Sequence, residues 1–179
     1  MTIETLAKQG RTRIHGPLAG INSQQLKKMR DKGLRSCFER FSEMRYRMEY
    51  VTRIHNKTFI NDASSRNANA TCYALENAQG RIVWIAERGN NQTDYSQLKN
   101  VALRKVQYLY CVGGADSNMR DSFEGIIPNI IDTDTLQEAV TKAFYCNLEE
   151  ATILYSPCSP NGHETAYNGE SFRNEVNEL

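Results

Sequence analysis

Short apolar runs alternate along the chain with segments in which apolar residues recur at helical spacing. The clearest runs, Arg81 to Ala86 and Val106 to Val112, predict strands that are covered on both faces of a sheet. Between such runs, Leu136, Val140 and Phe144 are spaced as on one face of a helix. Strands that alternate with helices predict an α/β domain with right-handed crossovers.

A hairpin precedes this alternating region. Residues Tyr46 to Val51 alternate between polar and apolar and, with Thr52 to Ile54, predict a strand. Thr58 to Ile60 returns antiparallel after a turn at His55 to Lys57. We therefore expect a Rossmann-like three-layer domain, with a mostly parallel sheet and an antiparallel N-terminal hairpin strand. The other expected elements are short strands over 129–132 and 152–155 and helices over 95–103, 117–123, Thr133 or Asp134 to Cys146, and Gly169 to Asn177 with Phe172 and Val176 inward.

The stretch Phe59 to Glu76 joins a strand to a helix through a small polar turn. We expect the helix to begin near Asn67, because Asn67 or Asn69 can accept a backbone N–H that the first turn leaves unpaired. The expected apolar face of this helix carries Ala70, Tyr73 and Ala74. Exposed N–H groups and the helix dipole favour anions at such a helix start. The alternative is an ordinary strand–helix connection.

Polar and turn-forming residues follow several of the expected strands. In a parallel sheet the carboxyl ends of the strands share one edge, and ligands of such sheets bind there. The residues at these ends are Asn61-Asp62, Glu87-Arg88-Gly89, Gly113-Gly114 and Ser156-Pro157. We therefore expect a binding site along this edge.

Composition limits the class of protein. The 179 residues are 40% hydrophobic and include five Cys, and no two of these are spaced as C-x-x-C. Unpaired cysteines in that number predict a reduced, cytoplasmic protein without structural zinc. No apolar run is long enough to cross a bilayer, so we expect no membrane association.

Charge is unevenly distributed. Residues 1–58 carry 13 Lys/Arg against 5 Asp/Glu, whereas the rest of the chain carries 9 against 16. A basic segment can bind nucleic acid, but this one shows no DNA-binding signature and lacks interleaved aromatics. The preferred interpretation is a solvated surface, or one that docks on an acidic partner.

Several chemical signatures are missing from the sequence. It contains neither the G-x-x-x-x-G-K-[ST] of a P-loop nor a G-x-G-x-x-G after a strand. His15, His55 and His163 are far apart, so we expect no metal site. Ser156 lacks the G-x-S-x-G context of a nucleophile, and no catalytic residue is assigned.

Five fragments, taken together and in order, resemble the C-terminal domain of the Mur ligases, especially the branch that adds D-glutamate. They cover about residues 13–179. The fragments are His15-Gly16-Pro17 with Asn22-Ser23, Arg45 to Glu49 (family H-R-x-E), Phe59 to Asp62 with Asn67 and Ala70-Thr71 (family I-N-D-S-K-A-T-N…A-T), Val83 to Ala86 through Asp94 to Ser96, and Ser156-Pro157 with Gly169 and Phe172.

The resemblance implies an ATP- and magnesium-dependent ligase of peptidoglycan synthesis, in which a carboxylate is phosphorylated and then attacked by an amino group. It implies that the C-terminal domain contributes nucleotide contacts, here Arg47, Asp62 and Asn67. The incoming amino acid would be bound on the side where this chain has the substrate-contact candidates Arg66, Asn91, Ser159 and Tyr167.

The chain departs from the family pattern mainly on the amino-acid side. Tyr46 stands where the family has His, while Ser64 and Arg66 replace the Lys and Thr of the D-S-K-A-T-N segment. In the glycine-rich loop, Glu87 and Arg88 replace two glycines, and Asn91 replaces the Lys that would pair with a substrate carboxylate. Loss of a charge-assisted contact weakens binding, and Arg66 is the candidate to bind the carboxylate in its place.

These observations leave two interpretations of domains and function. We expect residues 1–40 to be a basic tail and helix, a remnant of the family's central domain, and residues 41–179 to be the Mur-ligase-like domain. The chain would then need a companion chain with the P-loop domain, would be inactive alone, and would not bind ATP or magnesium tightly. The alternative is a degenerate stand-alone paralogue that binds a nucleotide or a protein, which the start at Met1 and the substituted loop favour.

Overall fold

The computed structural model describes residues 45–89, 93–115, 117–159 and 165–179, all within the unit Ser42–Leu179. The expected tail and helix over residues 1–40 lie outside these ranges, as do His15, Asn91 and His163. The domain boundary near residue 40 therefore stays a prediction.

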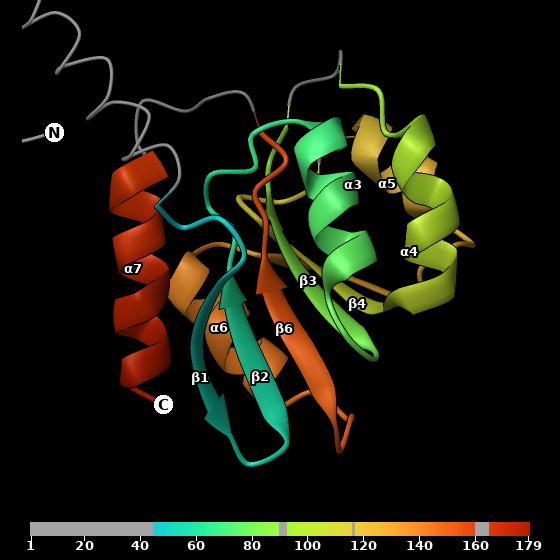
Figure 1. Ribbon diagram of the computed structural model, residues 1–179. Helices are drawn as coiled ribbons and strands as arrows, with labels where there is room; N and C mark the ends of the chain where they lie inside the picture. The colour runs from blue at the N-terminus through green and yellow to red at the C-terminus, as the bar shows by residue number, and fades with distance from the viewer. Residues whose placement is uncertain (1–44, 90–92, 116, 160–164) are drawn as a thin grey trace, which may run out of the picture. The chain divides into compact units, whose positions relative to one another are not determined.

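A six-stranded sheet forms the middle layer (Figure 1), with the strand order β1-β2-β6-β3-β4-β5. β1 pairs antiparallel with β2, and all other neighbours pair parallel. The strands are β1 (Glu49–Ile54), β2 (Lys57–Asn61), β3 (Ile82–Glu87), β4 (Val106–Val112), β5 (Asn129–Thr133) and β6 (Ala151–Tyr155). This mostly parallel sheet with an antiparallel hairpin strand confirms the expected fold class.

Helices cover both faces of the sheet. One face carries α3 (Ala68–Asn77), the 3-10 turn η1 (Ser96–Leu98), α4 (Lys99–Lys105) and α5 (Ser117–Phe123), and the other carries α6 (Leu136–Phe144) and α7 (Thr165–Asn177). The first interface is built around the fully buried Trp84, whose ring meets Phe123 edge-on at 5.5 Å. The second has Tyr155 stacked on Phe172 at 5.0 Å, so both inward residues expected from α7, Phe172 and Val176, are buried.

Besides the start of α7, which lies at Thr165 rather than Gly169, three local predictions were wrong in detail. β1 begins at Glu49 rather than Tyr46, because Tyr46 (φ 62°) and Met48 (φ 47°) adopt left-handed backbone conformations that end the extended pattern. Thr135, not Thr133 or Asp134, caps α6, since its hydroxyl accepts the N–H of Glu138.

The third difference concerns α3. Its buried residues are Ala68, Thr71, Ala74 and Leu75. Tyr73, expected on the same face as Ala74, is 57% exposed. The helix start itself is confirmed, because the side chain of Asn67 accepts the N–H of Ala70 at 2.9 Å.

Within the described residues, no helix has both the length and the apolar character that a membrane span requires.

Candidate functional site

The carboxyl ends of the strands meet as expected from the sequence. The N–H of Asp62, just past β2, donates to the carbonyl of Tyr155 at the end of β6 (2.8 Å). The N–H of Glu87, at the end of β3, donates to Pro157 (3.0 Å) in the segment that follows β6. Residues far apart in the sequence are therefore held by backbone hydrogen bonds along one edge of the sheet.

Asp62 is the buried centre of this edge, with 1% of its surface exposed. Its Oδ1 accepts the backbone N–H of Met48 (3.1 Å), and its Oδ2 accepts the hydroxyl of Ser156 (3.0 Å). Burial raises the pKa of the Asp62 carboxyl, although its hydrogen bonds and the nearby charge of Arg47 act in the opposite direction. Asp62 thus fixes the loop that carries Arg47 rather than presenting its carboxylate to solvent.

Arg47 is exposed and borders a hollow of about 360 Å³ between its loop and α3. The other lining residues are Met48, Tyr73 and Asn77. The hollow therefore combines a guanidinium with an exposed aromatic ring. Together with Asn67 at the start of α3, the candidate nucleotide residues lie on one edge of the sheet, which is the arrangement that their proposed role requires.

On the neighbouring part of the edge, Glu87 is held by two donors. The hydroxyl of Tyr155 donates to its Oε1 at 2.5 Å, and Nδ2 of Asn168 from α7 donates to the same oxygen at 2.8 Å. Burial, and then the charge of Glu87, raise the pKa of the Tyr155 phenol well above its ordinary value. Tyr155 and Asn168 thus form a carboxylate-binding cradle, and the side chain of Glu87 occupies it.

Tyr155 and Asn168 were missed in the sequence analysis. Tyr155 reads as the last residue of an apolar strand, and Asn168 lies beside the more conspicuous Gly169. Nothing in the local pattern links either residue to Glu87, 68 and 81 positions away.

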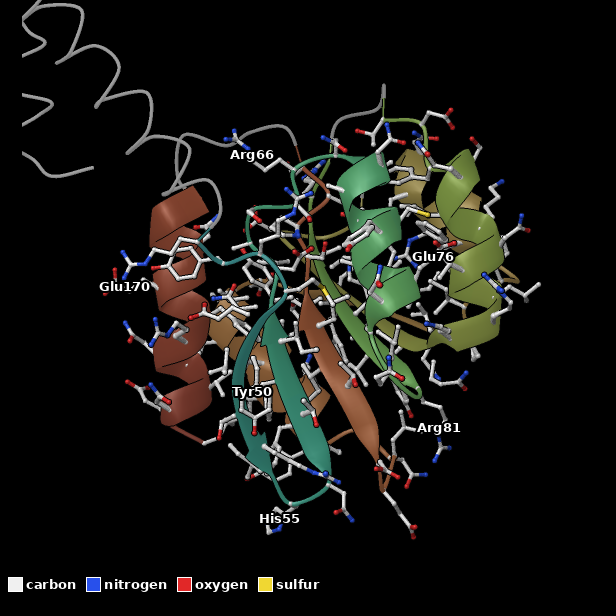
Figure 2. All side chains as sticks on the ribbon, viewed as in Figure 1. Tyr50, His55, Arg66, Glu76, Arg81 and Glu170 are labelled. Carbon is white, nitrogen blue, oxygen red and sulfur yellow. The ribbon has the colours of Figure 1, made fainter. Side chains whose placement is uncertain are left out.

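The predicted substrate contacts are only partly described. Ser159 is 4% exposed, and its hydroxyl donates to the carbonyl of Arg88 at 3.2 Å. Arg66 is half-buried in the loop after β2 (Figure 2). Tyr167 lies in α7, its side chain being outside the described part, and Asn91 is outside it altogether. The roles of these four residues stay predictions.

Basic side chains dominate the accessible charge at this edge. Arg47, just before β1, and Arg88, just after β3, are exposed. The two acids nearby are occupied, Asp62 by burial and Glu87 by its two donors. An edge with exposed cations and occupied carboxylates favours an anionic ligand.

The described residues do not fit a magnesium site. They contain no group of three His, Cys, Asp or Glu side chains placed to hold a metal ion. Both carboxylate oxygens of Asp62 already accept hydrogen bonds, and the ring of His55 stacks on Phe144. A metal bound with a nucleotide would have to draw its protein ligands from elsewhere.

Known proteins resemble this chain over most of its length, although no protein-family model matches it. A UDP-N-acetylmuramoylalanine–D-glutamate ligase from Porphyromonas gingivalis (strain ATCC 33277) is 29% identical over 179 residues, which is 98% of this chain and 40% of the relative. The same enzyme from Christiangramia forsetii is 31% identical over 160 residues, 88% of this chain and 35% of the relative. The chain thus spans about two fifths of the length of these relatives.

Solved structures include a domain described as coming from a UDP-N-acetylmuramate:L-alanyl-gamma-D-glutamyl-medo-diaminopimelate ligase of Haemophilus ducreyi, with a TM-score of 0.49 and 12% identity. It covers 73% of this chain and 99% of that domain. The similarity to the D-glutamate ligases confirms the resemblance carried by the motifs: the chain resembles the C-terminal domain of a Mur ligase, and of UDP-N-acetylmuramoylalanine–D-glutamate ligase in particular.

Proposed function

We propose that this chain is the nucleotide-contacting C-terminal part of an ATP-dependent D-glutamate-adding ligase of peptidoglycan synthesis. The observation that supports this most directly is the position of Arg47. It is exposed beside buried Asp62, on the rim of the 360 Å³ hollow. In this proposal Arg47 binds a nucleotide phosphate, Asp62 positions the loop, and Asn67 orients the start of α3.

The hollow suits a purine nucleotide. Tyr73 is 57% exposed on α3, so its ring is accessible to the base. Aromatic rings stack on the flat face of any nucleotide base. Arg47, on the opposite wall, has the forked guanidinium that binds phosphate oxygens with two hydrogen bonds. The volume is within the range of small-molecule pockets.

Turnover requires a companion chain in this proposal. The sequence has no P-loop to hold a triphosphate, and the described residues do not fit a magnesium site. Phosphoryl transfer in P-loop enzymes uses both kinds of group. We therefore propose that a partner carrying the P-loop domain supplies them, and that ATP and magnesium bind productively only to the complex.

The second candidate function is a stand-alone module that has kept nucleotide binding and lost the amino-acid pocket. The contacts of Glu87 favour it. Tyr155 and Asn168 already bind the carboxylate of this residue, which stands at a position where the Mur ligases have a glycine. In this interpretation Arg66, Asn91, Ser159 and Tyr167 contact no substrate.

Calorimetric titration of the full chain tests the proposal. We expect ADP to bind, Arg47→Gln to weaken it about tenfold or more, and Tyr73→Ala about fivefold or more. Arg104→Gln and Tyr50→Ala are matched controls, because both side chains are exposed outside the hollow. The proposal would be overturned if ADP gave no binding heat, or if the variants and the controls lost the same affinity for ADP. Binding of D-glutamate to the chain would favour the ligase over the stand-alone module.

A further inference from the structure

A second hollow lies at the opposite edge of the sheet, where β2, β3 and β6 begin. Its volume is about 440 Å³, and buried Thr152 at the start of β6 is one of the residues that form it. Besides Gly80 and Ala151, the residues that line it have polar or charged side chains, including Arg53, Asn56, Thr58, Gln79, Arg81 and Glu150. Neither the motifs nor the proposed nucleotide site use any of these residues.

Charge in this hollow is unbalanced. Arg53 pairs with Glu150 at 3.4 Å, with side chains 50% and 74% exposed, so these two charges offset each other. Arg81 adds a second guanidinium, and within the described residues it has no ion pair or hydrogen bond from its side chain. Figure 2 shows Arg81 at the end of the domain away from Arg66. The hollow therefore carries one uncompensated positive charge.

Unused hydrogen-bonding groups surround that charge. The amide of Asn56 and the hydroxyl of Thr58 have no side-chain partner among the described residues. Thr152 differs, since its hydroxyl donates to the carbonyl of Gln79 at 2.7 Å. One guanidinium, one amide and one hydroxyl are thus available to a ligand at a single opening.

The backbone around the hollow is fixed by contacts between distant segments. The N–H of Thr152 donates to the carbonyl of Arg81 (2.8 Å), and the N–H of Ala151 donates to that of Asn56 (3.3 Å). The hairpin turn, the start of β6 and the turn before β3 therefore form one frame. A site built on such a frame loses little entropy when a ligand binds.

We propose that this hollow is a second binding site, for a small polar molecule with one carboxylate or phosphate group. Arg81 binds the anionic group with its forked guanidinium, while Asn56 and Thr58 contact the polar body. The volume fits a ligand of metabolite size. Glu150 limits the charge accepted to a single anionic group, because a second one would meet the Glu150 carboxylate.

Two-dimensional ¹⁵N NMR of the full chain tests this inference at constant ionic strength, which keeps screening equal between points. The probes are inorganic phosphate, glycerol 3-phosphate, acetate and L-glutamate. We expect saturable shifts of the Gly80, Arg81 and Thr152 amides with at least one probe. The phosphate and carboxylate arms tell the two head groups apart.

Four variants make the test specific. Arg81→Gln should weaken binding about tenfold or more, and Glu150→Gln should strengthen it severalfold by releasing Arg53. Arg104→Gln is the control for general loss of positive charge. Arg81 is exposed, so its variant should keep a native spectrum. Absence of saturable shifts with all four probes, or equal affinity for Arg81→Gln and wild type, would overturn the proposal. Arg47→Gln should leave this site unchanged, which separates it from the nucleotide site.

Discussion

The hydroxyl of Ser156 donates to Oδ2 of Asp62 at 3.0 Å, in a fully buried contact between residues that follow β6 and β2. The same carboxylate accepts the N–H of Met48, next to Arg47. Asp62 therefore connects the middle of the sheet to the loop that carries the proposed phosphate contact. Changes at this carboxylate should alter both stability and binding.

Replacement of Asp62 should be more costly with Ala than with Asn. Asp62→Ala leaves the Met48 N–H without its acceptor and removes one of the two partners of the Ser156 hydroxyl, the other being Oγ1 of Thr71. This should cost about 1–3 kcal/mol of unfolding free energy. Asp62→Asn keeps an oxygen for Met48 and should cost less. Urea unfolding can be followed by the fluorescence of Trp84, the single tryptophan, which is fully buried. Equal losses in the two variants would show that these hydrogen bonds contribute little.

The pH dependence of stability should reflect the raised pKa of Asp62. The native carboxyl keeps its proton above the ordinary aspartate value of about 3.9, so the native state binds more protons than the unfolded state there. The stability of wild type relative to Asp62→Asn should then be greatest in acid and fall as pH rises from about 3.9 to the native pKa. Unfolding both proteins across this range measures the difference, and a rise with pH would contradict the burial effect.

Removal of the Glu87 side chain should create a site for an external carboxylate. Glu87→Ala leaves the Tyr155 hydroxyl and the Asn168 amide without their acceptor, and should lower stability by about 1–3 kcal/mol. Acetate should then raise the melting temperature of the variant more than that of wild type, because only the variant has the vacated cradle. Chloride at equal ionic strength is the control. An identical response to the two anions would mean that the two donors do not form a cradle.

The sequence predicted the sheet well, because buried parallel strands have a simple signature. Val106 to Val112 is apolar over most of the length of β4, and Asn67 caps α3 through a local hydrogen bond. Local pattern also explains the errors. The alternation from Tyr46 onward resembles a strand, although Tyr46 and Met48 have positive φ that no short-range signal reveals.

The site was predictable only where it depends on chain order. The strand ends meet because parallel strands share an edge, and this follows from the order of elements. The Glu87 cradle and the Arg81 hollow depend on which side chains from distant segments meet. The hollow lies at the amino ends of the strands, where sequence reasoning places no ligand. Neither feature has a motif.

Lys57 should be far more important for stability than an ordinary surface lysine. It is 7% exposed, and its ammonium donates to the carbonyls of Phe144 (2.5 Å) and Cys146 (2.9 Å) at the end of α6. Lys57→Met should lower unfolding free energy by about 2–3 kcal/mol, because these carbonyls lose a charged donor. Lys142→Met, which removes an exposed pair with Glu138, should cost no more than about 0.5 kcal/mol. If urea unfolding shows similar losses of unfolding free energy for Lys57→Met and Lys142→Met, the special contribution of Lys57 is refuted.

Gly169 links α7 to the loop that carries Arg47. A Cβ at this position would lie 2.5 Å from Cγ and Cδ2 of Tyr46, whose ring is 3% exposed. In Gly169→Ala the ring of Tyr46 must move. Arg47 is the next residue in the chain, so the movement shifts the loop that carries it. The displacement should cost about 1–3 kcal/mol, more than the gain of up to about 1 kcal/mol from helix propensity.

Gly125→Ala is the matched control for this variant. Gly125 has φ +72°, and a Cβ added there would have no atom within 4 Å, so only backbone strain of about 1 kcal/mol is introduced. Both variants should be less stable, but only Gly169→Ala should also weaken ADP binding severalfold, because only there does the Tyr46 loop shift. Calorimetry at a temperature where both variants are folded separates the two effects. Unchanged ADP affinity in Gly169→Ala would mean that the position of Arg47 does not depend on Tyr46 packing, and the proposed phosphate contact would then need another means of support.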